Sequence, residues 1–263
     1  MDLKLTGKLA LVSGSTAGIG LAIADLLARE GARVIINGRT QAAVDKAVAA
    51  VKAGAKGEVL GFAGDLSAAG IAEELARRHP HVEILVNNLG IYEAKPFLQI
   101  TDADWQRFFN VNVLSGARLA RLYLPAMLKV NWGRIVFISS ESGVQIPPEM
   151  IHYGMTKSAN LAISRGLAEA VAGTGVTVNA VLPGPTRSRG VNDFVEAAAR
   201  ARGVPAATIE KEFIDKARPS SLIKRFATTE EVAAMVAYVV SPLASATTGA
   251  ALRVDGGVVK SAF

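Results

Sequence analysis

The chain of 263 residues contains no cysteine and only three histidines, His79, His81 and His152. Without cysteine it can form neither a disulfide nor a thiolate metal site, and it has no thiol nucleophile. The histidines are too few and too scattered along the sequence for a metal site, so we expect no bound metal. Long apolar runs are also lacking: the stretch 232–240 is soon followed by Pro242, whereas a membrane span needs roughly 18 apolar residues.

The N-terminal segment from Met1 to Lys8 places a charge directly before a short strand and has no signal-peptide core. We therefore expect a cytoplasmic protein with no membrane partner. The net charge is +6, but the basic residues are spread along the whole length. This distribution argues against a nucleic-acid partner and indicates a charged surface with a few cations near a phosphate-bearing ligand.

Half of the residues are apolar, which is enough for a large core in one α/β domain over 1–263. Short β-rich runs alternate with longer stretches of helical periodicity, the pattern of βαβ units. We predict a doubly wound parallel sheet of seven strands with helices on both faces, because parallel neighbours are joined by right-handed crossovers. The expected strands are 9–12, 34–36, 59–62, 84–86, 134–138, 176–181 and 251–254, and the expected helices are 19–29, 42–52, 68–78, 102–128, 153–172 and 229–239.

The segment 185–226 is too long for a plain connection between the sixth strand and the last helix. It contains two polar stretches with helical periodicity, 191–202 and 207–216, bounded by Gly203 and Pro219. Connections of this length in compact α/β domains are usually functional. We predict that the segment forms a lid over a substrate site.

A glycine-rich turn follows the first expected strand and reads Ser13-Gly14-Ser15-Thr16-Ala17-Gly18-Ile19-Gly20. Glycines there permit a tight turn and let backbone N–H groups approach a pyrophosphate at the positive end of the following helix. The spacing is G-x-x-x-G-x-G and not the general G-x-G-x-x-G fingerprint, and glycine-rich turns also occur without a ligand. We predict dinucleotide contacts at Gly14, Ser15, Thr16, Gly18, Ile19 and Gly20.

The ends of the second and third strands bear on the choice of dinucleotide. An acid after the second strand would hydrogen-bond a ribose 2′-OH, whereas an arginine accommodates a 2′-phosphate. The chain has Asn37-Gly38-Arg39 there and no carboxylate, so we favour NADP(H) over NAD(H), with Arg39 as the phosphate contact or, alternatively, a solvated residue at a helix start. Asp65 and Leu66 follow the third strand, where the carboxylate contacts the cofactor, caps the next helix, or does both.

Tyr153 and Lys157 are spaced as i and i+4, which on a helix brings their Cβ atoms to about 5–6 Å. An ammonium beside a phenol favours the phenolate and lowers its pKa, so the pair forms a usable acid and base. Ser140 stands upstream, at the end of the fifth expected strand. Taken alone, Tyr-x-x-x-Lys is more often an exposed amphipathic pair, and the rest of the chain decides for the catalytic interpretation.

Further motifs follow the strands in order: Asn87-Asn88-Leu89-Gly90, Asn110-Val111-Asn112-Val113, Ile138-Ser139-Ser140, Pro183-Gly184 and Val254-Asp255-Gly256-Gly257. Together with the glycine loop and Tyr-x-x-x-Lys, they resemble the short-chain dehydrogenase/reductase family in its compact Rossmann form, similar to 3-oxoacyl-carrier-protein reductases and other bacterial members. The resemblance covers nearly the whole chain. It implies a catalytic tetrad of Asn112, Ser140, Tyr153 and Lys157, and adds Asn88, Gly90, Tyr153, Lys157, Pro183, Gly184 and Thr186 to the cofactor contacts.

The resemblance also implies an NAD(P)(H)-dependent oxidoreductase that transfers a hydride between the nicotinamide and a carbonyl or secondary alcohol. In that reaction Tyr153 is the acid and base, Lys157 holds the nicotinamide ribose and lowers the Tyr153 pKa, and Ser140 binds the substrate oxygen. Asn112 anchors a water that links Lys157 to solvent. Taken singly, Ser140 is as well explained as a turn cap, and Asn112 as a partner of buried backbone groups in a bent helix.

Two positions depart from the family pattern. Leu89 stands where alanine is usual, which bears on the local fit beside the cofactor. Ala17 stands before Gly18, where many NADP-dependent members carry a basic residue, so Arg39 alone is left to contact the phosphate.

The substrate does not follow from the sequence beyond the class of small carbonyl or alcohol compounds. The segment 145–152 and the lid should wall the pocket, and Arg187, Arg189 and Lys224 would either meet an anionic substrate or lie on a solvated face. The family commonly forms tetramers through long helices, here 105–128 and 153–171, so we expect a homotetramer or homodimer. A nucleotide-sensing protein would not need the tetrad, and related epimerases or dehydratases usually add a C-terminal substrate domain; these two remain the alternatives.

Overall fold

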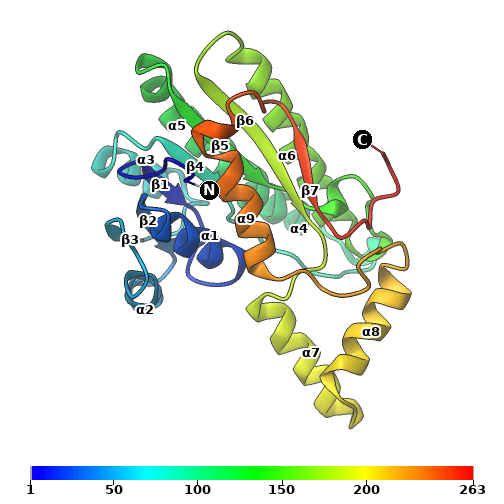
Figure 1. The fold of residues 1–263 in the computed structure, drawn as a ribbon. Coiled ribbons are helices and arrows are strands. Elements are labelled where there is room, and N and C mark those ends of the chain that lie inside the picture. The colour runs from blue at the N-terminus through cyan, green and yellow to red at the C-terminus, as the bar shows by residue number, and fades with distance from the viewer. Residues whose placement is uncertain (1, 263) are drawn as a thin grey trace.

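The computed structural model describes residues 2–262, and the side chains of all of them except Arg189 and Phe194. Its centre is a parallel sheet of seven strands in the order β3-β2-β1-β4-β5-β6-β7 (Figure 1). The predicted sheet is confirmed, with every strand end within two residues of its expected position. The strands are β1 Leu9–Val12, β2 Arg33–Gly38, β3 Val59–Ala63, β4 Ile84–Asn87, β5 Gly133–Ile138, β6 Val176–Pro183 and β7 Ala251–Val254.

Helices cover both faces of the sheet and form two cores with it. Successive strand side chains point to opposite faces, so Val12 packs in the core beneath one helix layer while Leu11 packs in the other. The first layer is formed by α1 Gly18–Arg29, α2 Gln41–Lys52 and α9 Thr229–Val239. The second is formed by α3 Ala69–Arg78, α5 Ser115–Lys129 and α6 Ile151–Ala170.

The predicted helix 102–128 is not one regular helix. Its two parts are α4 Asp102–Phe109, which opens with a capping box from Thr101, and α5; a π-helical turn, Asn110–Leu114, joins them. In a π-helical turn each backbone hydrogen bond spans one residue more than in an α-helix. Such turns are frequent at functional sites. It carries Asn112, whose placement is described below.

The sheet order places the functional loops together. Strands β1 and β4 are neighbours, and the chain turns outward in opposite directions from them to β2 and β5. In a doubly wound sheet the crevice at this switch point, beyond the carboxyl ends of the strands, is where ligands bind. The glycine loop after β1 and Asn88 after β4 both lie there.

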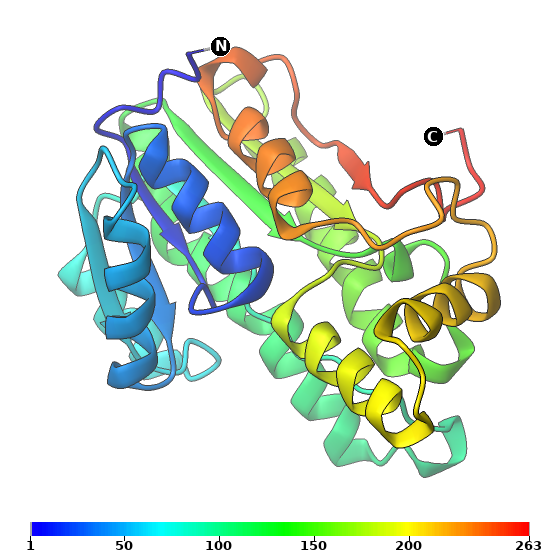
Figure 2. The ribbon, with the colours of Figure 1, turned by 60° about the horizontal axis from the view of Figure 1, so that its bottom comes forward.

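The predicted lid is a pair of helices, α7 Arg189–Arg202 and α8 Ala206–Ala217, that projects from the body of the molecule (Figures 1 and 2). A small core of its own, around Val195, Ile209 and Phe226, holds the pair together. The two ends of the segment pair at a parallel bridge between Thr186 and Ala227, where Arg187 N donates to the Ala227 carbonyl across 2.8 Å. The lid therefore leaves and rejoins the sheet at one point.

Among the described residues, no helix is long and apolar enough to cross a membrane. Within the same residues, no group of three or more histidine, aspartate or glutamate side chains is placed to hold a metal ion.

Candidate active site

The glycine loop is held in a tight turn by side chains from two neighbouring strands. Gly14 has φ of 62°, a conformation that glycine adopts without strain. Asn88 Nδ2 donates to the carbonyls of Ser13 and Gly14 at 2.9 and 3.0 Å. A Cβ on Gly20 would clash with Asn88 Nδ2 and lie 2.7 Å from the Gly14 carbonyl oxygen. Gly20 is therefore required by packing within the turn.

The first turn of α1 fits a dinucleotide pyrophosphate. Among the described residues no side chain caps this helix, whose N-cap is Ala17, and the first turn contains no acid. The N–H groups of Gly18, Ile19 and Gly20 are thus left for an anion, and all three residues line the cavity described below. The predicted cofactor contact of Ser15 has no donor left, because its buried hydroxyl donates to the Val12 carbonyl and its N–H donates to the Asn37 carbonyl at 2.8 Å.

At the end of β2, Asn37 and Arg39 have different surroundings. Asn37 is buried: its Oδ1 accepts from Gly14 N, and its Nδ2 donates to the carbonyls of Phe62 and Gly64. It braces the loops after β1 and β3 and is absent from the sequence-based predictions. Arg39 is exposed at this edge of the sheet, beside Thr40, the N-cap of α2.

After β3, Asp65 caps its own turn, since its Oδ1 accepts from Ser67 N at 2.9 Å and from Ser67 Oγ at 2.7 Å. The Leu66 side chain lies in the core and is 1% exposed, so only its backbone is left for a cofactor. The predicted cap of the next helix is wrong, because the N-cap of α3 is Ala68, without a side-chain bond, and Asp65 closes the turn before it. The exposed position of Asp65 at the same sheet edge as Arg39 is compatible with a ligand contact.

Tyr153 and Lys157 lie one turn apart on α6, with Lys157 Nζ 5.6 Å from the centre of the Tyr153 ring. Lys157 is 5% exposed, and its Nζ donates to the Ile138 carbonyl at 2.8 Å. Burial disfavours the ammonium and lowers the pKa of Lys157 to about 8.

The surroundings of Tyr153 act against the pKa direction predicted from the sequence. Burial raises the pKa of the phenol, a hydrogen bond with Ser140 lowers it, and the charge of Glu141 raises it further. The expected net lowering of the Tyr153 pKa is therefore wrong for the protein alone, because burial disfavours the phenolate more than Ser140 and Arg218 favour it.

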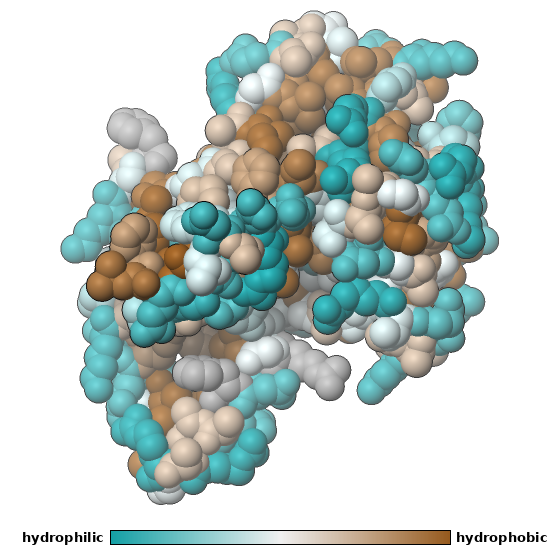
Figure 3. Space-filling view, turned by 180° about the vertical axis from the view of Figure 1, so that it is seen from behind, coloured by the Kyte–Doolittle hydropathy of each residue, from teal (hydrophilic) through white to brown (hydrophobic). Residues whose placement is uncertain are grey.

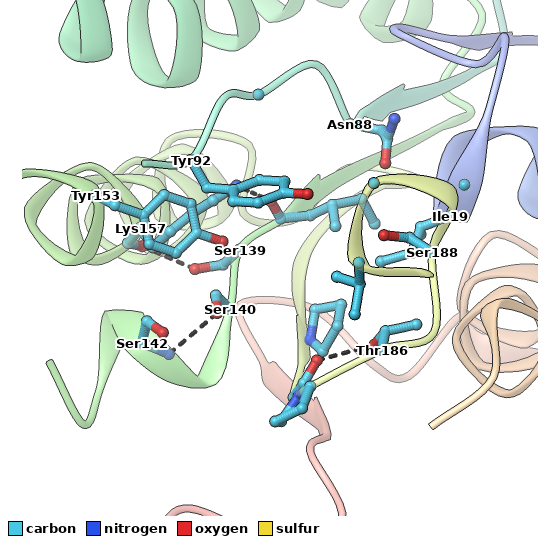
Figure 4. A pocket seen from close by; sticks show the side chains of 18 of the residues that line it. Ile19, Asn88, Tyr92, Ser139, Ser140, Ser142, Tyr153, Lys157, Thr186 and Ser188 are labelled. Carbon is cyan, nitrogen blue, oxygen red and sulfur yellow. Dashed lines mark hydrogen bonds between the residues drawn. The ribbon is translucent and has the colours of Figure 1, made fainter. Parts of the chain in front are cut away.

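Ser140 is 6% exposed and sits between β5 and a short 3₁₀ turn, Glu141–Gly143. It caps that turn, since Ser142 N donates to its Oγ at 3.1 Å. Its own hydroxyl donates to Glu141 Oε2 at 2.5 Å. The capping alternative is thus part of the structure, and it holds the hydroxyl at the mouth of the cavity together with Tyr153 (Figure 4).

Asn112 faces the loop after β4 from the π-helical turn. Its Oδ1 accepts from Ile91 N at 2.8 Å, and its Nδ2 donates to the Ile91 carbonyl and to Thr156 Oγ1. A Cβ built on Gly90 would lie 3.5 Å from both Asn112 Oδ1 and Lys157 Nζ, so these two groups approach the same glycine. Asn112 therefore ties this loop to α6 beside Lys157.

A cavity of about 450 Å³ joins the glycine loop to the tyrosine and is closed on one side by the lid (Figure 4). Of the predicted site residues, the cavity is lined by Gly14, Gly18, Ile19, Gly20, Asn88, Gly90, Ser140, Tyr153, Lys157, Pro183, Gly184 and Thr186. The remaining ones lie outside its lining, namely Ser15, Thr16, Arg39, Asp65, Leu66 and Asn112.

The two positions that depart from the family pattern are accommodated. Leu89 is partly buried against one of the cores, and its N–H donates to Ser13 Oγ at 3.0 Å. Ala17 lines the cavity at the start of α1.

Two charged residues of the cavity were missed by sequence reasoning, Glu141 and Arg218. Both are buried, and no local pattern marks them, since they are 77 residues apart and meet only in the fold. Two of the lid cations predicted to meet an anionic substrate or solvent have partners within the chain: Arg187 pairs with Glu210 at 2.6 Å, and Lys224 Nζ donates to the Pro219 carbonyl. The side chain of Arg189 lies outside the described ones.

Comparisons with known proteins agree with this site. The sequence model of a family described as Enoyl-(Acyl carrier protein) reductase matches residues 14–259. The chain is similar to the uncharacterized oxidoreductase YvrD of Bacillus subtilis (strain 168), at 47% identity over 99% of this chain and 100% of the relative. It is similar to the 3-oxoacyl-(acyl-carrier-protein) reductase FabG of Aquifex aeolicus (strain VF5), at 36% identity over 98% of this chain and 100% of that protein.

Among solved structures, L-sorbose reductase from Gluconobacter frateurii, complexed with NADPH and L-sorbose, matches with a TM-score of 0.93 and 29% identity over 99% of this chain and 100% of that chain. The chain belongs to the short-chain dehydrogenase/reductase family, as its motifs predicted. It is a nicotinamide-dependent oxidoreductase of carbonyl or alcohol substrates, which confirms the predicted reaction class.

Proposed function

We propose that the protein reduces a small carbonyl compound, or oxidises the corresponding alcohol, with Tyr153 as the acid and base. The observation that carries this proposal is the cavity itself, in which Ser140, Tyr153 and Lys157 face the first turn of α1. A bound nicotinamide would supply the hydride in reduction and accept it in oxidation. Tyr153 gives its proton to the substrate oxygen in reduction and takes it back in oxidation.

Ser140 hydrogen-bonds the substrate oxygen as negative charge develops on it. To do so, its hydroxyl turns from Glu141 toward the cavity. Glu141 Oε2 remains satisfied when this happens, because Ser142 N and Ser142 Oγ also donate to it. Lys157 holds the nicotinamide ribose, and Asn112 fixes the loop around Gly90 and the water that leads to Lys157.

The cofactor that we propose is NADP(H). Gly14, the first turn of α1, Asn88, Gly90 and the segment from Pro183 to Thr186 hold it at the crevice, with Arg39 at the 2′-phosphate and Asp65 near the adenine. Arg39 supports the assignment by its exposed position after β2, where no acid is present. The NADPH complex of the sorbose reductase supports it independently.

The proposed function is tested by binding and turnover together. NADPH and NADH are titrated against the purified protein by fluorescence, and a panel of ketones and aldehydes is screened by the loss of reduced-nicotinamide absorbance. We expect tighter binding of NADPH and consumption of at least one carbonyl compound. Tighter binding of NADH would overturn the cofactor assignment, and binding of neither would overturn the nucleotide site.

For the whole protein, we propose a single nucleotide-binding domain over 1–263 with the lid at about 185–226, located in the cytoplasm and assembled as a homotetramer or homodimer. Assembly is supported by apolar side chains that stay exposed on the helical layer of α4 and α5, such as Phe109 at 41% and Leu128 at 40%. The face opposite to the view of Figure 1 likewise shows apolar surface between polar side chains (Figure 3). Size-exclusion chromatography with light scattering tests this; a monomer would contradict it.

A further inference from the structure

A buried carboxylate lies directly behind the proposed catalytic serine. Glu141 is 3% exposed, and three donors converge on its Oε2: Ser140 Oγ, Ser142 N and Ser142 Oγ. An ionised carboxylate only accepts hydrogen bonds, so the proton in each contact comes from the partner. The position of the Ser140 hydroxyl therefore depends on where Glu141 is held.

Glu141 is held by an arginine from the lid. Arg218 follows directly after α8 and is 8% exposed, and its Nε donates to Glu141 Oε1 at 2.7 Å. Its Nη1 donates to the Ala217 carbonyl at 2.7 Å and lies 3.4 Å from Glu149 Oε1, in the turn before α6. One guanidinium thus joins the lid, the end of β5 and the turn that leads to Tyr153.

The burial of this ion pair separates it from the other lid pairs. Its side chains are 9% and 5% exposed, whereas those of Arg202 and Glu212, which join α7 to α8, are 51% and 32% exposed. Exposed pairs contribute little to stability, but removing one partner of a buried pair leaves an uncompensated charge. A buried pair at the lid base therefore stabilises the fold little, which favours a role in placing the groups that it joins.

We propose that the Glu141–Arg218 ion pair is a clasp that fastens the lid to the end of β5 and, through the bonds of Glu141 to Ser142, holds the turn on which the Ser140 hydroxyl lies beside Tyr153. Glu141 and Arg218 are positioning residues in this scheme, because they act through Ser140 and Tyr153. The inference rests on the proposed function of that site.

The two residues of the clasp, Glu141 and Arg218, shift the pKa of Tyr153 in opposite directions. The groups that face the phenol are Glu141 after β5, Tyr92 after β4, Arg218 from the lid and Lys157 on α6. The negative charge of Glu141 raises the pKa of Tyr153, and the positive charge of Arg218 lowers it. Removing either charge therefore leaves the effect of the other charge on the Tyr153 pKa uncompensated.

Arg218→Met and Glu141→Gln are therefore compared in alcohol oxidation, which requires the phenolate. We expect kcat to fall by up to about 100-fold in each, with cofactor affinity unchanged, because misplacement of a catalytic group has effects of that size. The pH at which activity rises should move up in Arg218→Met and down in Glu141→Gln. The double variant should lose no more than the worse single variant, because both residues act through one contact.

Arg202→Met is the matched control, since it removes a lid ion pair that does not reach β5. Arg218→Lys retains the positive charge, so its kcat should lie between those of Arg218→Met and the native protein. Losses that multiply in the double variant, or pH shifts in the same direction, would overturn the clasp.

A readout without turnover separates the clasp from the proposed function. Amide exchange is compared at the C-terminal end of α8, at the base of the lid. It should quicken there in Arg218→Met and stay unchanged there in Arg202→Met. Equal exchange in the two variants contradicts the clasp even if no substrate is found. Quickened exchange in a protein that turns over no carbonyl compound would support the fastening of the lid while counting against the reaction.

Discussion

Lys157 Nζ donates to the carbonyl oxygen of Ile138, the last residue of β5, across 2.8 Å. This bond fastens the helix that carries Tyr153 to the strand that leads into Ser140. Ser139 Oγ adds a second bond between the two elements by donating to the Lys157 carbonyl at 2.8 Å. The relative placement of Tyr153 and Ser140 is therefore fixed by two side-chain-to-backbone hydrogen bonds, one from the Lys157 side chain and one to the Lys157 carbonyl.

Replacing Tyr153 by phenylalanine should lower turnover by at least about 100-fold, because a positioned acid or base contributes a factor of this order or more. Cofactor binding should remain measurable, since the glycine loop is untouched. The measurement is the steady-state rate together with a fluorescence titration of NADPH. Tyr238→Phe, on the exposed side of α9, is the control and should keep full activity. Retained activity in Tyr153→Phe would refute the assignment.

The buried Lys157 predicts a pH dependence of stability. Its pKa in the folded protein is about 8, against an ordinary value of 10.5. Between these values the unfolded chain binds more protons, so stability rises with pH across that window. We compare the unfolding free energy of the native protein with that of Lys157→Met. The difference should shift in favour of the native protein by about 1–3 kcal/mol between about pH 7 and pH 10. Urea titrations of both proteins measure this, and parallel curves would show that Lys157 is not desolvated.

Gly20→Ala should disrupt the nucleotide end of the site. The added methyl group clashes with Asn88 Nδ2 and approaches the Gly14 carbonyl, so the loop must shift. NADPH affinity should fall and the protein should be less stable. Gly70→Ala in α3 is the matched control, because its Cβ meets nothing within 4 Å. That variant should gain up to about 1 kcal/mol from helix propensity.

Arg39→Ala should weaken NADPH binding by about tenfold, the effect of losing one charge-assisted contact, and leave NADH binding nearly unchanged. Arg77→Ala is the control, since Arg77 is also exposed and lies on α3, away from the end of β2. The measured quantity is the ratio of the two dissociation constants. An equal change for both nucleotides would show that Arg39 does not contact the 2′-phosphate.

Much of the fold was predictable because each strand is a short apolar run bounded by polar turns. The β7 strand and α9 begin and end at the predicted residues. The π-helical turn at Asn112 was missed, since the helical periodicity of 102–128 continues across it. The direction of the Tyr153 pKa was wrong because spacing on a helix reveals which charge is near and not how deeply the phenol is buried.

The clasp lay beyond sequence reasoning for a different reason. Glu141 reads as a polar residue in a turn, and Arg218 as one more exposed cation near a proline. Only the folded chain shows that they meet across 77 residues and that both are buried. Long-range pairs of this kind leave no mark on local periodicity.

The bridge between Thr186 and Ala227 has an evolutionary consequence. Because the segment departs and returns at adjacent backbone positions, the helices α7 and α8 between them can lengthen, shorten or be exchanged without altering the strand order. Under the proposed lid function, an exchange of these helices would change the substrate site and leave the residues around Tyr153 in place. The proposed clasp limits such exchanges, since a lid taken from another protein must supply a residue that pairs with Glu141.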